Sequence, residues 1–135
     1  MTLTRELFDT MTAQAGLSSE VLADAVDTLQ ECEEIVAACA MGMLGAQDAL
    51  LVAAAISRDL DCADILGVTR RVLTRGSGPD HTLITAQVEA CLLACERSHE
   101  LCSQHADHHA HCRMCADATG RCADMCRKVL SSIHV

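Results

Sequence analysis

Aromatic side chains are nearly absent from this sequence. It has no tryptophan and no tyrosine, and Phe8 is its single phenylalanine. Because aromatic rings usually supply much of the volume of a core, the apolar half of the chain must pack from Ala, Leu, Val, Cys and Met instead. Such a core is narrow, so the elements around it must lie close together.

Basic residues are also scarce. Ten Lys and Arg stand against nineteen Asp and Glu, which gives a formal net charge of −9. Nucleic acids and anionic membrane surfaces attract the opposite balance, because phosphate groups bind Lys and Arg. The composition therefore predicts neither a nucleic-acid partner nor a membrane partner.

Long apolar segments are missing as well. The apolar run 49–56 is too short to cross a bilayer, which takes about 20 residues. Residues 1–14 include Glu6 and Asp9 and lack the apolar centre of a secretory signal. We therefore expect a cytosolic protein.

Helical periodicity recurs along the chain, and no segment alternates polar and apolar residues as a strand does. We predict an all-α fold, an antiparallel up-down-up-down four-helix bundle with a short extra N-terminal helix, as one domain over residues 1–135. Ser18 or Ser19 is expected to cap the first bundle helix, Gly42 and Gly45 to mark its end, and Gly76–Asp80 to form a loop. The expected helices span about 3–14, 19–44, 47–74, 81–106 and 110–133.

The second bundle helix should carry an apolar inner stripe with acidic residues outside. We assign Asp59, Asp61 and Asp64 to the solvated surface. The predicted stripe comprises Leu51, Ala55, Cys62, Leu66, Thr69 and Leu73.

Cysteine is abundant, and the ten cysteines fall into stripes. On a helix turning about 100° per residue, the cysteines of each predicted helix share a face. These are Cys32 and Cys39 on the first bundle helix, Cys62 on the second, Cys91, Cys95 and Cys102 on the third, and Cys112, Cys115, Cys122 and Cys126 on the fourth.

These thiols are not expected to form structural disulfides in a reducing compartment. Cβ atoms at i and i+4 lie about 5–6 Å apart, whereas a disulfide needs about 3.8 Å. Thiolates are soft ligands that select Cu(I), Zn(II) or iron–sulfur clusters. Zinc takes a tetrahedron and clusters use loop-borne cysteines, whereas Cu(I) accepts two or three sulfurs shared between ions. Stripes along a bundle therefore favour multiple Cu(I) ions, on the order of ten or more per chain, over an inert core of small side chains.

Antiparallel packing places the thiols in two layers. The layer nearest the turns at Gly45 and His108 comprises Cys39, Cys102, Cys112 and Cys115. The other comprises Cys32, Cys62, Cys91, Cys95, Cys122 and Cys126. Val36, Ser98 and Thr119 should point inward between them.

A histidine-rich corner lies at the same end as the first layer. His105 projects on the thiol face of its helix and is the first choice as a ligand at the channel mouth, followed by His109 or His111. Met43 can offer a thioether there, or equally fill the core. The alternative for these histidines is a solvated turn.

No catalytic pattern stands out, and we predict no enzyme activity. The Glu-x-x-His motif of di-iron bundles occurs once, at Glu96–His99. Two binding functions remain as alternatives to copper storage: a zinc-binding or thiol redox-sensing helical protein acting through a protein partner, and a metallochaperone with one exposed site. Buried thiol stripes disfavour the metallochaperone.

Three segments resemble the copper storage proteins, a family of cysteine-lined four-helix bundles. They are DLDCADI (59–65), Cys91-x3-Cys95 followed by Cys102, and HCRMCADATGRCADMC (111–126). The resemblance, to the cytosolic branch, implies high-capacity Cu(I) storage and copper tolerance, admission at one end beside histidines and a methionine, and a homotetramer. A copper chaperone is then a candidate donor. Val36, Leu66, Ser98 and Thr119 stand where the family often has cysteine. At the level of Ser98 and Thr119 we expect either an interrupted metal array or hydroxyls that line a gap for anions or water.

Overall fold

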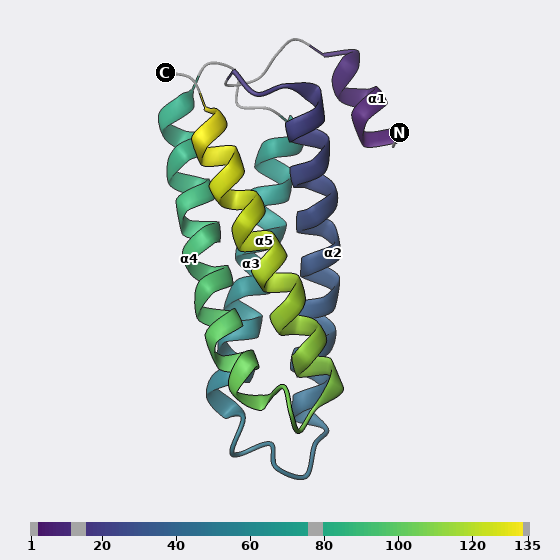
Figure 1. Ribbon diagram of the computed structural model, residues 1–135, viewed down its shortest axis with the longest axis vertical. Coiled ribbons are helices and arrows are strands. Elements are labelled where there is room, and N and C mark those ends of the chain that lie inside the picture. Colours follow the sequence, from purple (N-terminus) through teal and green to yellow (C-terminus); the bar gives the residue numbers. More distant parts are fainter. Residues whose placement is uncertain (1–2, 12–15, 76–79, 134–135) are drawn as a thin grey trace.

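The computed structural model describes residues 3–11, 16–75 and 80–133. Within these ranges every element is an α-helix: α1 (Leu3–Asp9), α2 (Ser19–Leu44), α3 (Ala53–Arg75), α4 (His81–His105) and α5 (Ala110–Ser132). The last four run up and down alternately as a long antiparallel bundle, and α1 lies outside it (Figure 1). This architecture confirms the predicted fold class.

The bundle helices form a closed ring around one core. α2 packs against α3 and α5, and α4 packs against the same two helices. The turn 45–52 and the turn 106–109 lie at one end of the bundle, which is the lower end in Figure 1. We call this the mouth end, because the predicted channel opening lies there.

Local signals explain where α2 begins and ends. Ser18 is the N-cap, and its hydroxyl accepts a hydrogen bond of 3.1 Å from the backbone N–H of Val21. Gly16 before it has φ of 73°, in the left-handed region that favours glycine. Gly45 follows the last helical residue, as predicted.

Two predicted helix boundaries were wrong. α3 begins at Ala53 and not at 47, because residues 45–52 form consecutive turns closed by bonds such as Leu51 N–H to the Asp48 carbonyl, 2.8 Å. Leu51 therefore leaves the inner stripe and is 79% exposed. α1 ends at Asp9 and not at 14, where Thr10 turns its hydroxyl back to the Leu7 carbonyl at 2.6 Å.

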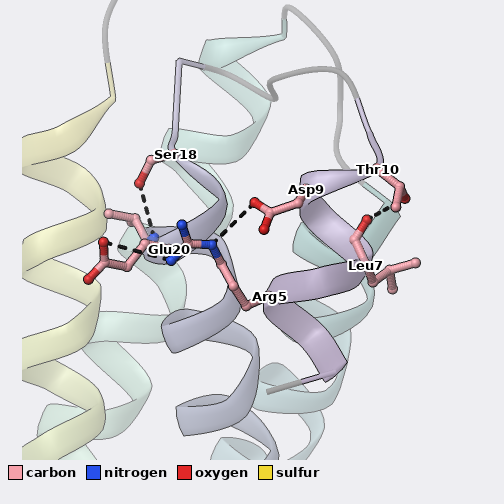
Figure 2. A network of polar contacts seen from close by, with 7 residues as sticks. Arg5, Leu7, Asp9, Thr10, Ser18 and Glu20 are labelled. Atoms are coloured by element: carbon pink, nitrogen blue, oxygen red, sulfur yellow. Dashed lines mark hydrogen bonds and ion pairs between the residues drawn. The ribbon is translucent and has the colours of Figure 1, made fainter. Parts of the chain in front are cut away.

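The short helix α1 is fastened to the side of α2. Its Phe8 is buried, and Thr4 donates a hydrogen bond of 2.8 Å to Asp27. Arg5 reaches Asp9 at 3.2 Å within α1 and Glu20 at 3.9 Å on α2 (Figure 2). The ion pairs are exposed, so Phe8 contributes most of this anchorage.

The loop predicted at Gly76–Asp80 lies outside the described residues for 76–79. Asp80 is described, and its carboxylate caps α4 by accepting from the backbone N–H of Leu83 at 3.0 Å. None of the helices in the described ranges is long and apolar enough to cross a membrane.

Candidate metal centre

The core of the bundle is lined by thiols from all four of its helices. Each of the ten cysteines is free and at most 1% exposed. α2 carries two, α3 one, α4 three and α5 four, so the antiparallel packing brings their stripes to one axis. We describe them as a mouth group, Cys39, Cys102, Cys112 and Cys115, and a deep group, Cys32, Cys62, Cys91, Cys95, Cys122 and Cys126.

Thiols of the mouth group already contact one another. The Sγ atoms of Cys102 and Cys115 are 3.3 Å apart, and those of Cys39 and Cys112 are 3.8 Å apart. These contacts cross between α4 and α5 and between α2 and α5. A Cu(I) ion that replaced a thiol proton would find its second sulfur close by.

Asp59 completes the mouth group, and its assignment to the solvated surface was wrong. Its side chain is 0% exposed, and Oδ1 accepts from Ser98 Oγ at 2.7 Å and from Cys102 Sγ at 3.3 Å. Cys115 Sγ lies 3.6 Å from the same oxygen. Single donor atoms of Cys39, Asp59, Cys102 and Cys115 all lie within 4.8 Å of one another, so the four can share a metal ion.

The position of Asp59 in the sequence already indicates that its side chain points into the core. Residue 59 follows Ala55 by four positions and precedes Cys62 by three, so it lies on the inner stripe of α3. The charge of its side chain concealed this, because an unpaired carboxylate is normally excluded from a core. A buried carboxylate among thiols is therefore a functional residue that the hydrophobic pattern alone does not reveal.

Burial and neighbouring thiols set the protonation of the mouth group. Burial raises the pKa of Asp59 to about 7, and hydrogen bonding with Cys115 raises the pKa of Cys102 to about 11. Burial raises the pKa of Cys112 to about 11. Hydrogen bonds from Cys102 and Cys39 lower the pKa of Cys115 to about 6. The mouth group therefore holds one thiolate, Cys115, next to thiols that keep their protons. A metal ion that binds the thiolate can displace the protons of the neighbouring thiols.

The deep group consists of sulfur alone. The Sγ atoms of Cys91, Cys95 and Cys122 lie within 4.8 Å of one another. Hydrogen bonds from Cys122 and Cys95 lower the pKa of Cys32 to about 5, and those from Cys122 and Cys126 lower the pKa of Cys91. Hydrogen bonding with Cys122 and Cys126 raises the pKa of Cys95, and hydrogen bonding with Cys126 and Cys32 raises the pKa of Cys122, so both hold their protons. The deep group thus also shares protons among neighbouring sulfurs.

The three residues predicted between the two groups are all buried. Val36, Ser98 and Thr119 are 0% exposed. The Thr119 hydroxyl donates to its own helix, to the carbonyl of Cys115 at 2.8 Å. Ser98 holds Asp59, and its Oγ also lies 3.9 Å from Cys115 Sγ. This level therefore carries two hydroxyls and a methyl-bearing side chain in place of thiols.

His111 is the histidine that reaches the thiols. Its Nδ1 lies 3.5 Å from Cys39 Sγ and 3.6 Å from Cys112 Sγ, and these three residues form a second group of converging donors. Partial burial lowers the pKa of His111, so the ring is neutral and available as a ligand at neutral pH.

His109 and His105 lie farther out at the mouth end. The His109 ring stacks on that of His111 with centroids 5.0 Å apart, and its Nε2 lies 3.0 Å from Asp48 Oδ2. This bond lowers the pKa of Asp48. His105, His108 and His109 line a hollow of about 720 Å³ above the turn 45–52. In the described part of the chain, the converging groups of donors include His111 and neither His105 nor His109.

Met43 is fully buried one helical turn after Cys39 on α2. It therefore lies on the same face as the mouth group and at the same end of the bundle. Its place suits either a thioether ligand or a filling residue of the core.

The comparisons with known proteins agree with this geometry. A family model described as copper storage protein matches residues 17–131. The chain is similar to the copper storage protein Ccsp from Streptomyces lividans loaded with 10 copper equivalents, at a TM-score of 0.91 and 31% identity over 96% of this chain and 98% of that one.

A second structure, of a cytosolic copper storage protein from S. lividans with five coppers, is similar at a TM-score of 0.81 and 32% identity over 83% of this chain and 93% of that one. The structure of a histidine-to-alanine variant of S. lividans Ccsp is similar at a TM-score of 0.85 and 30% identity, over 88% of this chain and 99% of that one. No curated protein sequence matches the chain significantly.

Proposed function

The chain belongs to the copper storage protein family, and on that premise we propose that it stores Cu(I) on the thiolates that line its bundle. One observation carries the proposal: all ten cysteines are buried, free and turned to one axis, in two adjoining groups. Storage requires many neighbouring soft ligands and no reacting centre, so we also propose that the protein has no enzymatic role.

The physical chemistry of a thiol-lined core favours Cu(I) over other guests. Cu(I) takes two or three sulfurs, and a sulfur can bridge two ions, so closely spaced thiols can hold about as many ions as there are cysteines. Each bound ion offsets the charge of one thiolate, which lowers the cost of ionised groups in a water-free core. The proposed ligands are the ten cysteines, with Met43 as a further donor.

The mouth end is the proposed route of admission. His111 with Cys39 and Cys112 forms the first converging donors, and the hollow lined by His105 and His109 lies outside them. In this proposal His105 and His109 receive the ion, His111 passes it to the mouth group, and Asp59 assists there. Copper then moves from sulfur to sulfur toward the deep group.

Zinc binding is the second candidate, and the mouth group favours it. Cys39, Asp59, Cys102 and Cys115 offer three sulfurs and one oxygen within 4.8 Å, which is a set that a tetrahedral zinc ion accepts. The deep group distinguishes the two candidate functions. A single zinc site would leave its six thiols without a role, whereas a copper storage protein would use them as ligands.

Location and assembly are proposed by analogy with the relatives. One S. lividans relative is described as a cytosolic copper storage protein, and we propose a cytosolic location here as well. We further propose a homotetramer that receives copper from a copper chaperone. Exposed apolar side chains on α3 and α4, among them Leu60, Val68 and Leu93, support an assembly through these helices.

Anaerobic titration of the fully reduced protein with Cu(I), against a competing chelator, tests the function. We expect saturation on the order of ten or more ions per chain, with helical circular dichroism unchanged between the metal-free and loaded forms. Saturation at one to three ions would refute storage. A parallel titration with Zn(II) that fills more tightly than Cu(I), or a metal-free protein that loses its helices, would favour the zinc protein.

A further inference from the structure

The imidazole of His111 can reach the mouth group only because α2 presents no side chain where the ring lies. The ring belongs to α5, yet its Nδ1 sits between Cys39 of α2 and Cys112 of α5, at 3.5 and 3.6 Å. To lie there, the ring must press against the backbone of α2. The residue of α2 at this point is Gly42, three positions after Cys39.

The contact between Gly42 and His111 is so close that even a methyl group at position 42 would displace the ring. A Cβ built on Gly42 would lie 3.0 Å from Cδ2, 3.1 Å from Nε2 and 3.2 Å from Cγ of the ring. Cδ2 is bonded to the other two atoms, so an approach to the ring edge would leave those two clearly farther away. The near equality of the three distances places Gly42 over the face of the imidazole.

A second contact limits how far the His111 ring can move. His109 stacks on it with an interplanar angle of 23°, and His109 is itself held by Asp48 at 3.0 Å. A side chain at position 42 would therefore push His111 out of a seat that other residues have already shaped.

We propose that Gly42 is a positioning residue for copper uptake: its missing side chain forms the seat that aims His111 Nδ1 at Cys39 and Cys112. This rests on the proposed function, in which those three donors admit Cu(I). The groups of a donor site tolerate displacements of only about 0.5 Å from the productive geometry, so a shift of a few tenths of an ångström takes up much of that tolerance and should slow binding rather than abolish it. In the Gly42→Ala variant the ring must give by a few tenths of an ångström.

The chain supplies a matched control on the same helix end. A Cβ on Gly45 would meet only backbone oxygens of Met41 and Gly42, both at 3.8 Å, which is ordinary contact. Both glycines have helical or near-helical backbone, so alanine fits either without backbone strain. Alanine at position 42 should also favour the helix, so a loss of uptake there could not be blamed on a weakened fold.

Two readouts test the seat. The first needs no copper: long-range ¹H–¹⁵N spectra of the metal-free protein report the imidazole nitrogens of His111. We expect Gly42→Ala to shift them and Gly45→Ala to leave them in place. Unchanged His111 signals in Gly42→Ala would refute the proposal that Gly42 positions the ring, independently of how the variant binds copper.

The second readout is the rate of Cu(I) uptake under stopped flow. We expect Gly42→Ala to slow it roughly threefold or more, and Gly42→Val to slow it further, with the final number of bound ions unchanged and Gly45→Ala like the natural protein. In a His111→Ala background, Gly42→Ala should have no additional effect. A shifted ring with an unchanged rate would overturn the role in uptake, and so would slowing that persists without His111. A natural protein that takes up no copper would instead refute the proposed function.

Discussion

The mouth group and the deep group are built on the same four helices but differ in the atoms they present. At the mouth, α3 contributes the carboxylate of Asp59 and α5 adds the imidazole of His111. At the deep level, α3 contributes Cys62, and the six side chains are all thiols. One turn of α3 thus exchanges an oxygen donor for a sulfur donor, and the nitrogen donor on α5 belongs to the mouth end alone.

This difference separates admission from retention. Nitrogen and oxygen donors bind Cu(I) less tightly than thiolates do, so they suit a place where ions pass. Mouth thiols also hydrogen-bond one another and Asp59 at 3.3 to 3.8 Å, which keeps the group compact without metal. The deep group offers only soft ligands, so it suits lasting storage.

Removing matched sets of three thiols gives the largest effect and tests this division. The mouth variant replaces Cys39, Cys102 and Cys115 by Ala, and the deep variant replaces Cys91, Cys95 and Cys122 by Ala. Since both lose three ligands, each should lose roughly a third of the Cu(I) capacity in an anaerobic titration. Only the mouth variant should load slowly in stopped flow. Equal loading rates in the two variants would remove the distinction between the groups.

Replacing His111 by Ala should slow the loading of both groups without lowering their final content. The ring is the nitrogen donor that reaches Cys39 and Cys112, so its loss should slow uptake about tenfold. His108→Ala is the control, because its exposed side chain lines the hollow away from the thiols. Comparable slowing in both variants would mean that the corner attracts copper only as a general histidine patch.

Asp59→Asn should remove a pH dependence from the metal-free protein. Burial raises the pKa of Asp59 from an ordinary 3.8 to about 7, so the folded state binds this proton more tightly than the unfolded state. Its contribution to the free energy of unfolding is therefore present below pH 4 and is lost as the pH rises to about 7, by roughly 2–4 kcal/mol. Asn keeps an oxygen for Ser98 and cannot ionise.

Urea unfolding of both proteins between pH 4 and pH 8 measures this change. The natural protein should lose stability relative to Asp59→Asn as the pH rises through that range. Parallel curves for the two proteins would show that Asp59 titrates as an ordinary surface carboxylate.

Thr119→Cys is expected to give the smallest effect, by joining the two groups. The hydroxyl at 119 bonds to the carbonyls of Cys115 and Ala116 on its own helix, so a thiol can replace it with little disturbance. We expect about one additional Cu(I) per chain by titration. Ser98→Cys is the comparison, since it also removes the 2.7 Å bond to Asp59 and should cost about 1 kcal/mol in stability. An unchanged copper content in Thr119→Cys would mean that this level does not interrupt the array.

Most of the fold could be predicted from the sequence, because periodicity and caps determine a helical bundle. Ser18, Gly45 and the inward spacing of the thiols carried that prediction. The start of α3 was missed because the apolar residues 49–52 could continue a helix, whereas the turns over residues 45–52 depend on bonds such as that from the Leu51 N–H to the Asp48 carbonyl. Propensity alone does not decide between these two conformations.

The thiol lining of the site could be predicted from the sequence, but the positions of its histidines and of Asp59 could not. Helical angles place a side chain inward but do not say which of several corner histidines touches a thiol, since that depends on how α5 enters the bundle. His111 reaches the mouth group because Gly42 leaves room on α2, a contact between distant parts of the chain. The burial of Asp59 was not predicted, because its carboxyl is stabilised by Ser98 and by thiols of α4 and α5, which are distant in the sequence.

Anomalous scattering at the copper edge, from crystals of the fully loaded protein, tests copper storage along the bundle most directly. We expect copper peaks along the bundle axis in both groups, with peaks between Cys91, Cys95 and Cys122 as well as beside Asp59 and His111. Copper confined to the mouth group or to the outer histidines, with the deep thiols free of metal, would contradict storage on the thiol lining.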